Sequence, residues 1–303
     1  MTDKPKVWLN NKIIPWDDAQ VPILSHGFAR GSAVFEVFGT HAVPDGIAAF
    51  RMDAHLKRLE QTVSLLGMEL GFSIQEIVKA VSKLAVINLS ERGLVKIVAY
   101  WGEEAIINLV LKSKLDVAIF TIPTSEELGL DKVKPLSACI SKWKKLHPET
   151  IPVQAKACAN YLNGYLVRKD ANDRGFDLGL NLGTDGFLAE GSIESVFIVK
   201  DGILKTPPLG RILASVTRDS IINAAKHDDI EVCETALVKE DLYTADEIFT
   251  CHTGIKVTPI FRFEELELKA PGPVTTQVSE MMNNIINSRD SRFKEWFQML
   301  YRH

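Results

Sequence analysis

Cysteine is scarce in this sequence of 303 residues, and the four cysteines that occur lie far apart. They show neither the paired spacing of a zinc site nor the density of a disulfide framework, and no His-Glu-x-x-His motif is present. We therefore expect no metal site and a reducing compartment, for which the cytoplasm is the simplest choice. No apolar run is long enough to span a bilayer, and the first residues lack the apolar core of a signal peptide.

An excess of charge of one sign is also missing. The 35 basic and 39 acidic residues give a formal net charge of -4. This balance gives no reason to expect nucleic acid or an anionic membrane as a partner. The chain is 46% hydrophobic and 24% charged, which is ordinary for a soluble globular protein, and its length is enough for two domains or one large one.

The first 122 residues predict a small α+β domain. Strands around tight turns are indicated at residues 7–14 and 33–50, where Asn10-Asn11 and Asp45-Gly46 supply the turn residues. Two helices should follow. Asp53 is a candidate N-cap for the first helix, and Ser73-Ile-Gln-Glu76 forms a capping box for the second. Three further apolar runs predict strands at 94–101, 106–111 and 115–122.

Residues 123–137 are mostly polar and predict the connection to a larger domain at 138–303. In that domain, hairpins are indicated around Thr184-Asp185-Gly186 and around Asp201-Gly202. A strand is expected at 247–250. Helices are expected at about 161–174, 215–227, 239–245 and 275–288, and a short amphipathic helix at the end of the chain.

One lysine, Lys156, lies among small and apolar residues in the stretch 151–162. Loss of hydration lowers the pKa of such a lysine, and the resulting neutral amine can attack an aldehyde to form a Schiff base. Tyr161 is close enough in sequence to place its phenol at the same site. The alternative is a surface lysine at the start of a helix, and the choice between the two depends on residues elsewhere.

Four other features suggest chemistry. Glu190, beside Gly191 at the end of a strand, could keep a heterocyclic nitrogen protonated. The segment 214–219 opens a helix whose amides and Thr217 hydroxyl could bind an anion. Thr253 and Arg51 could add phosphate contacts. Each feature has an ordinary alternative as a turn acid, an N-cap or a strand-end charge. An amine, a carboxylate for a ring nitrogen, a phenol and a phosphate cradle together describe a pyridoxal phosphate (PLP) site.

The sequence resembles the class IV aminotransferases, which are fold-type-IV PLP enzymes of the D-amino acid aminotransferase-like fold. Among them it looks most like the branched-chain amino acid aminotransferases. The matching stretches follow family order over nearly the whole chain: 25–36, 50–59, 150–162, 186–191, 200–208, 216–219, 245–247 and 253–259. The resemblance implies an α+β fold with a small N-terminal and a larger C-terminal domain. It also implies a homodimer whose active site lies at the subunit interface.

The resemblance also implies roles for individual residues. Lys156 would hold PLP as an internal aldimine and move the proton at the substrate Cα. Glu190 would hold the pyridine nitrogen protonated, and Tyr161 would bond the ring hydroxylate. The phosphate would be held by Arg51, Val216, Thr217 and Thr253. Substrate-binding residues would be Arg30, Phe35, Lys96, Gly191 and Gly254.

The chain departs from the branched-chain pattern at the substrate side. Arg30 stands where these enzymes usually have a tyrosine, and Lys96 lies in place of the arginine of a Tyr-x-Arg motif. We expect Arg30, reaching in from a partner subunit, and Lys96 to bind a substrate carboxylate. The alternative is that Arg30 pairs with a nearby acid such as Glu36.

The leading function is an aminotransferase that moves an amino group between an aliphatic, most simply branched-chain, amino acid and a 2-keto acid such as 2-oxoglutarate or pyruvate. A D-amino acid aminotransferase is the first alternative, favoured by Arg30 and by Val37 after Glu36. A lyase like aminodeoxychorismate lyase is the second, and a non-enzymatic protein that keeps the fold is the third. Lys156, Tyr161 and Glu190 are all present, which argues against the third.

Overall fold

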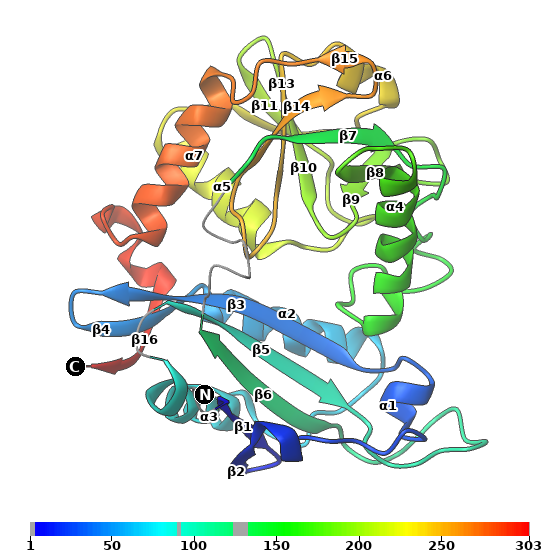
Figure 1. Ribbon diagram of the computed structural model, residues 1–303, viewed down its shortest axis with the longest axis vertical. Helices are drawn as coiled ribbons and strands as arrows, with labels where there is room; N and C mark the ends of the chain where they lie inside the picture. The colour runs from blue at the N-terminus through cyan, green and yellow to red at the C-terminus, as the bar shows by residue number, and fades with distance from the viewer. Residues whose placement is uncertain (1–3, 90–91, 124–132, 303) are drawn as a thin grey trace. The chain divides into compact units, whose positions relative to one another are not determined.

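The computed structural model describes residues 4–89, 92–123 and 133–302 (Figure 1). The chain forms two compact units. The first consists of Met1–Leu128, Ala155–Ala159 and Ile286–His303, and the second of Gly129–Gln154 and Asn160–Ile285. The predicted interdomain connection at 123–137 includes residues 124–132, which lie outside the described residues.

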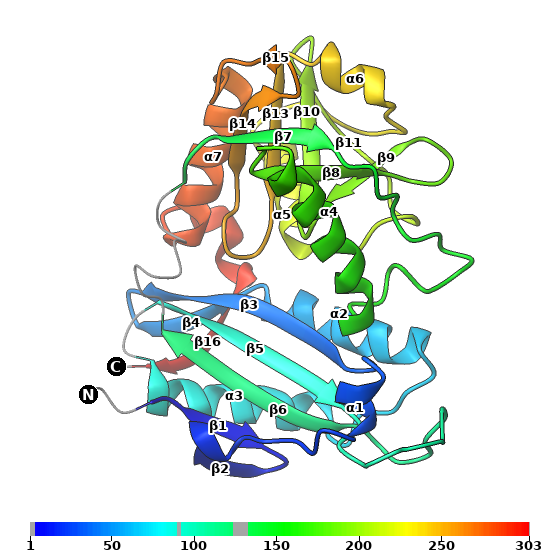
Figure 2. The same ribbon diagram turned by 45° about the vertical axis from the view of Figure 1, so that its right-hand side comes forward.

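The first unit contains a seven-stranded sheet in the order β16-β4-β3-β5-β6-β1-β2. Among the described residues, the strand pairs of this sheet are all antiparallel. The strands are β1 (Lys6–Leu9), β2 (Lys12–Pro15), β3 (Val34–Val43), β4 (Gly46–Phe50), β5 (Gly93–Tyr100), β6 (Asp116–Pro123) and β16 (Phe297–Arg302). The helical elements are η1 (Trp16–Asp18), α1 (His26–Ala29), α2 (Met52–Leu65), α3 (Ile74–Asn88) and η4 (Ser291–Trp296). The apolar sides of α2 and α3 pack against the sheet around Phe38, Leu59 and Ile97 (Figures 1 and 2).

Local signals account for much of this unit. Asn10 and Asn11 adopt φ of 45° and 67°, which a two-residue hairpin turn requires, so β1 and β2 pair as predicted. The capping box of α3 is confirmed, because Ser73 Oγ accepts from Glu76 N–H at 3.3 Å and Glu76 Oε2 accepts from Ser73 N–H at 2.8 Å. The N-cap predicted at Asp53 is wrong. Helix α2 starts at Met52, two residues earlier than that cap implies, and its N-cap is Arg51 in the left-handed conformation.

Two further predictions fail in this unit. The apolar run 106–111 is a loop, and its side chains at Ile106, Ile107, Leu109 and Val110 are 69–83% exposed. The end of the chain is a short 3-10 helix followed by β16, which pairs with β4, rather than a closing amphipathic helix. Both errors concern segments whose state depends on whether a distant strand is available as a partner.

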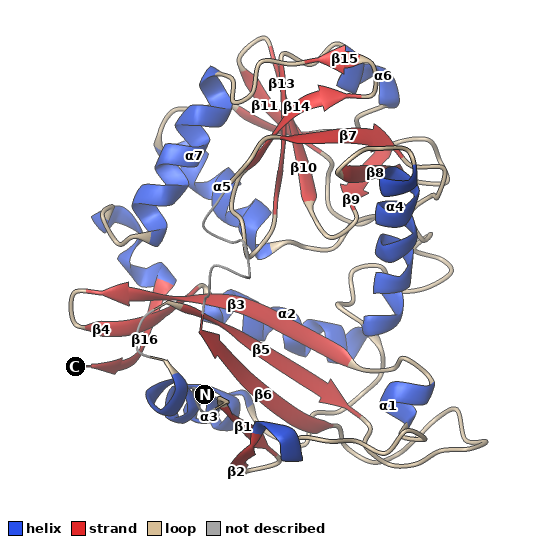
Figure 3. Ribbon diagram, in the orientation of Figure 1, coloured by secondary structure: helices blue, strands red, loops and turns tan. Residues whose placement is uncertain are grey.

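The second unit contains a nine-stranded sheet in the order β12-β11-β10-β13-β14-β7-β8-β9, with β15 beside β14. The strands are β7 (Leu136–Ile140), β8 (Leu178–Leu182), β9 (Leu188–Gly191), β10 (Ser195–Lys200), β11 (Ile203–Thr206), β12 (Val232–Glu234), β13 (Glu247–Cys251), β14 (Thr258–Phe263) and β15 (Leu266–Glu267). The helices are α4 (Tyr161–Asp173), α5 (Val216–His227), α6 (Lys239–Tyr243) and α7 (Pro273–Ile286), and the 3-10 turn η3 (Cys158–Asn160) precedes α4 (Figure 3). Both predicted hairpins are confirmed.

Each unit is therefore built from sheet and helices together, so the predicted α+β class is confirmed. The second sheet mixes parallel and antiparallel pairs, with β7 parallel to both β8 and β14. Its core is formed by Leu180, Val196, Ile198, Ile260 and Phe263. Across the described ranges, none of the helices is both long and apolar enough to cross a membrane.

Candidate active site

Lys156 belongs to a short segment that pairs with the start of β3. Its carbonyl accepts from Phe35 N–H at 3.1 Å, and Ala157 forms an antiparallel bridge with Val34. Its own N–H donates to Thr62 Oγ1 of α2 at 3.1 Å. The backbone of Lys156 is thus held by β3 on one side and by α2 on the other.

The Phe35 ring contacts two ammonium groups. Lys156 Nζ lies 4.8 Å from the ring centroid and Lys96 Nζ lies 5.5 Å from it. Strand pairing explains the arrangement, because Lys96 is opposite Val37, and side chains two residues apart on a strand share one face. The first unit therefore brings together three of the predicted site residues. Cys158 lies near both lysines. Although the residue is exposed, partial loss of hydration raises the pKa of its thiol, and the two positive charges oppose that rise.

A buried charged cluster lies on α2 and β3. Arg58 donates to both oxygens of Glu36 at 2.7 Å, and His55 Nδ1 lies 2.8 Å from Glu36 Oε2. Burial would raise the Glu36 pKa, but the Arg58 charge and the hydrogen bonds lower it to about 2. Burial, together with the charges of Arg58 and Lys156 and against the opposing effect of Glu36, lowers the His55 pKa to about 4.

The partner of Glu36 corrects one expectation for Arg30. Glu36 is bound by Arg58 and His55, so the alternative in which Arg30 pairs with Glu36 is wrong. Arg30 instead donates to the Ile106 carbonyl at 2.9 Å. The nearby His26 ring lies 3.1 Å from the Leu109 carbonyl through Nε2. Both contacts hold the backbone of the loop that carries the exposed apolar side chains.

Arg51 precedes α2 in a left-handed conformation, with φ of 53°. Its N–H donates to the Trp296 carbonyl at 2.7 Å, and its guanidinium carbon lies 4.7 Å from the centroid of the Trp296 ring. A contact between residues 245 positions apart is invisible to local sequence reasoning. The stacked ring and the backbone bond together fix where the Arg51 guanidinium can reach.

Glu190 lies on β9 in the second unit and has contacts on both carboxylate oxygens. The Lys145 ammonium donates to Oε1, and Leu213 N–H donates to Oε2 at 3.2 Å. The exposed side-chain fractions are 9% for Lys145 and 13% for Glu190, so this ion pair is largely buried. Sequence reasoning missed Lys145, although the basic run before Pro148 contains it. Next to Glu190, a Cβ added to Gly191 would lie 2.7 Å from Glu194 Oε2.

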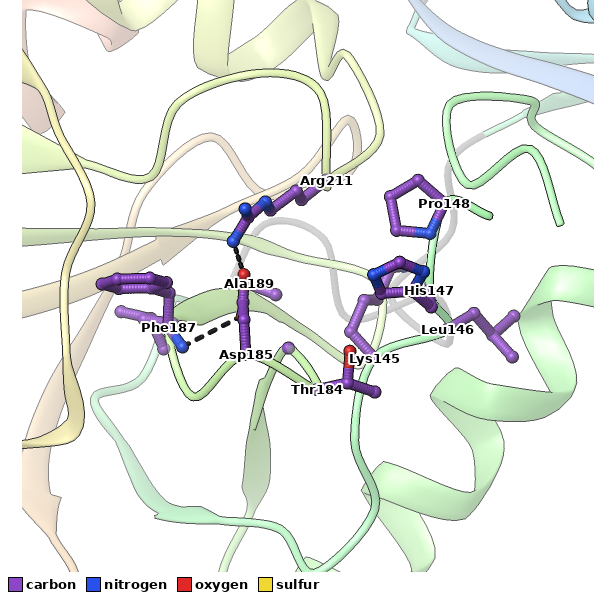
Figure 4. Close-up of a pocket in the computed structure, with 11 residues that line it drawn as sticks. Lys145, Leu146, His147, Pro148, Thr184, Asp185, Phe187, Ala189 and Arg211 are labelled. Atoms are coloured by element: carbon purple, nitrogen blue, oxygen red, sulfur yellow. Dashed lines mark hydrogen bonds and ion pairs between the residues drawn. The ribbon is translucent and has the colours of Figure 1, made fainter. Parts of the chain in front are cut away.

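A pocket adjoins the Lys145 side of this ion pair. Its lining includes Lys145, His147, Thr184, Asp185, Phe187 and Arg211 (Figure 4). In Figure 4 the Arg211 guanidinium points to Asp185, with which it forms an ion pair. This pair ties the turn before β9 to the loop that contains Leu213. The loop that donates to Glu190 is therefore itself anchored.

Helix α5 begins with an arrangement suited to an anion. Ser215 is its N-cap, and Ser215 Oγ accepts from Arg218 N–H at 3.2 Å. The helix offers no acceptor to the amides of Val216 and Thr217, because an α-helix leaves its first N–H groups without partners. Those two amides lie at the positive end of the helix dipole. Arg218 is committed elsewhere, since its guanidinium contacts Thr206, the Pro207 carbonyl and Glu234.

Thr253 and Gly254 form the tip of the connection from β13 to β14. His252 N–H donates to the Ile255 carbonyl at 3.0 Å and closes the tip. Gly254 N–H donates to His252 Nδ1 at 3.1 Å. The buried Lys256 ammonium donates to the Thr253 carbonyl. Sequence reasoning identified Thr253 and Gly254 but neither of the two side chains that fix them. Tyr161, the remaining predicted cofactor residue, is half-buried at the first position of α4.

The residue types present fit PLP. The first unit holds an amine against an aromatic ring. The second holds a carboxylate fixed at both oxygens and a helix start whose first two amides have no acceptor within the helix. A family model, Amino-transferase class IV, matches residues 33–263. The chain thus belongs to the class IV aminotransferases and is a PLP-dependent transaminase, as the resemblance implied.

Several relatives resemble the chain over nearly its whole length. The branched-chain-amino-acid aminotransferase of Escherichia coli K12 is 32% identical over 279 residues, which are 90% of each chain. A solved branched-chain aminotransferase from the archaeon Thermoproteus uzoniensis, with norvaline, has a TM-score of 0.93 at 31% identity and covers 98% of this chain and 99% of its own. That of Thermobaculum terrenum in its PLP form has a TM-score of 0.90 at 32% identity, covering 99% and 100%.

Proposed function

We propose that this transaminase moves an amino group between a branched-chain or other aliphatic amino acid and a 2-keto acid such as 2-oxoglutarate or pyruvate. The observation that carries the proposal is the similarity to branched-chain enzymes, at about 30% identity over 90% or more of both chains. The Phe35 ring beside Lys156 supports it, because an apolar ring suits an aliphatic side chain.

Lys156 is the proposed catalytic residue. PLP, when bound, supplies an electron sink for the pair left at the substrate Cα. Lys156 Nζ would hold the cofactor covalently when no substrate is present. During turnover it would carry the proton from Cα of the donor amino acid to C4′ of the cofactor, and in the second half-reaction from C4′ to Cα of the product amino acid. Its backbone bonds to Phe35 and Thr62 limit where Nζ can move.

Glu190 is proposed to hold the ring nitrogen of the cofactor in its protonated form. Lys145 and Leu213 N–H keep the carboxylate in one orientation, so Lys145 acts as a positioning residue. The phosphate is assigned to the amides of Val216 and Thr217, to Thr253 and to Arg51. Tyr161 is assigned to the ring hydroxyl of the cofactor.

The substrate side is assigned to Phe35, Gly191 and Gly254, with Lys96 and Arg30 for a carboxylate. Lys96 supports this role by its place beside Phe35 and Lys156. Arg30 uses one donor on the Ile106 carbonyl, and a guanidinium has five N–H donors in all. Arg30→Ala should raise KM for the carboxylate substrate far more than it weakens PLP binding, and unchanged kinetics would exclude the role.

The working form is proposed to be a homodimer in the cytoplasm, with the active site at the subunit interface. The exposed apolar side chains Ile106, Ile107, Leu109 and Val110, together with Phe28, support a self-association surface. Light scattering on the purified protein should give twice the mass of the 33.7 kDa chain. The variant Ile107→Glu should shift that mass toward the monomer.

A half-reaction panel tests the function. L-leucine, L-valine, D-alanine and D-glutamate are added one at a time to the PLP form. Only a true amino donor should change the absorbance spectrum of the bound cofactor to that of its pyridoxamine form. A 2-keto acid should then restore it. Conversion by L-leucine supports the proposal, and conversion by the D-amino acids alone favours the D-amino acid aminotransferase suggested by Arg30. Lys156→Ala, the control, should retain no cofactor after borohydride reduction and denaturation.

A further inference from the structure

The tip of the β13–β14 connection can offer an anion only a few donors. They are the N–H and hydroxyl of Thr253 and the N–H of Gly254. No residue in the described ranges accepts a hydrogen bond from Thr253. Gly254 N–H, in contrast, already donates to His252 Nδ1 at 3.1 Å. The donors of Thr253 are therefore available to a ligand, whereas Gly254 N–H already has an acceptor within the chain.

This contact assigns a role to one nitrogen of the His252 ring. A backbone N–H can only donate, so Nδ1 is the acceptor in this contact. Two further hydrogen bonds fix the backbone of the turn around His252 and Gly254. His252 N–H donates to the Ile255 carbonyl, and Lys256 binds the Thr253 carbonyl. The same turn thus places the imidazole on Gly254 and holds the half-buried Thr253 beside it.

We propose that His252 determines how this loop divides its donors between two anions. Its imidazole occupies Gly254 N–H, so that this donor is not available to a substrate carboxylate. The Thr253 donors stay available to the cofactor phosphate. The inference rests on the proposed function, in which Gly254 contacts the substrate carboxylate. A carboxylate that uses Gly254 must displace the imidazole, so His252 weakens ligands that depend on this N–H without affecting those held through Thr253.

Two substitutions separate the acceptor from the bulk of the ring. His252→Ala removes the acceptor. His252→Asn keeps one, because an asparagine Oδ1 accepts readily from the N–H two residues later. His252→Leu removes the acceptor but keeps a side chain of similar size, and it replaces the alanine variant if that variant does not fold. All variants are compared as PLP-loaded protein.

The probe is 4-methylvaleric acid, a leucine-sized carboxylic acid without an amino group. Calorimetry on the loaded enzyme should show that His252→Ala and His252→Leu bind it about tenfold more tightly than the native protein. This is the size of one ordinary hydrogen bond, because the acid no longer has to displace the imidazole from Gly254 N–H. His252→Asn should stay within about twofold of the native affinity. Uptake of PLP by the apoprotein should have the same affinity in all variants. In steady state, KM for the keto acid should fall while kcat stays unchanged.

Native affinity for the acid in His252→Ala and His252→Leu would overturn the inference. So would equal changes in the asparagine and alanine variants, which would indicate lost packing, or a parallel change in PLP affinity, which would indicate a loop that acts as one unit. Failure of the proposed function looks different. In that case the native protein takes up no PLP, or no amino acid converts the bound cofactor, whatever residue stands at 252.

Discussion

Replacing Arg58 with methionine removes the guanidinium that neutralises Glu36 inside the first unit. The Glu36 side chain is fully buried and that of Arg58 is 7% exposed. Arg58 donates through Nε to Oε1 and through Nη2 to Oε2, each at 2.7 Å. Methionine matches the length of the aliphatic part of arginine but provides no donor, so among the residues that the structure describes the carboxylate keeps only His55 as a partner.

The expected loss of stability follows from two independent routes. Removal of one partner from a buried ion pair costs roughly 3–5 kcal/mol. The net lowering of the Glu36 carboxyl pKa from 4.5 to about 2, which burial opposes and to which both Arg58 and His55 contribute, corresponds to roughly 3 kcal/mol at neutral pH and so gives only the scale of the effect. We therefore expect Arg58→Met to lower the free energy of unfolding by about 3–4 kcal/mol at pH 7.

Urea unfolding at pH 7, followed by circular dichroism, measures this change. Lys57→Met is the matched control, since Lys57 is exposed on the same helix, and it should change stability by less than about 0.5 kcal/mol. The double variant Glu36→Leu with Arg58→Met should recover most of the loss, because no buried charge remains without its partner. A loss below about 1 kcal/mol for Arg58→Met, or additive losses in the double variant, would refute this account of the cluster.

Three further predictions concern other buried groups. The His55 pKa of about 4 lies below its ordinary 6.5, so the folded protein binds fewer protons than the unfolded chain between these values. Stability should therefore rise from pH 4 to pH 6.5, and His55→Gln should flatten that part of the profile. Glu247 accepts from Val274 N–H at 2.9 Å and Thr275 N–H at 2.7 Å at the start of α7. Glu247→Gln should cost roughly 1–3 kcal/mol in urea unfolding, whereas the exposed control Glu265→Gln should be neutral. Lys145→Met should lower the melting temperature more in the apoprotein than in the PLP form, because a protonated ring nitrogen replaces the lost cation at Glu190. Equal losses in both forms would contradict the assignment of Glu190.

The sequence alone determined the features whose causes are local. Asn10-Asn11 specified a hairpin because their side chains tolerate positive φ, and Ser73 with Glu76 specified a helix start because the two residues satisfy each other's backbone donors. The order of short motifs around Lys156, Glu190 and Thr217 was enough to identify the family. These motifs are recognisable because each needs a particular residue type at a particular position.

Tertiary structure decided which groups pair across long separations. More than one basic residue lies near Glu36 along the chain. The packing of α2 on β3 decides that Arg58, and not Arg30, forms the ion pair with Glu36. The same holds for Lys145 on Glu190 and for Trp296 on Arg51. The apolar run at 106–111 had the composition of a strand, yet it became an exposed loop because a strand forms only where a neighbouring strand accepts its backbone hydrogen bonds. Pairing of this kind depends on the whole chain, and no local window of sequence contains it.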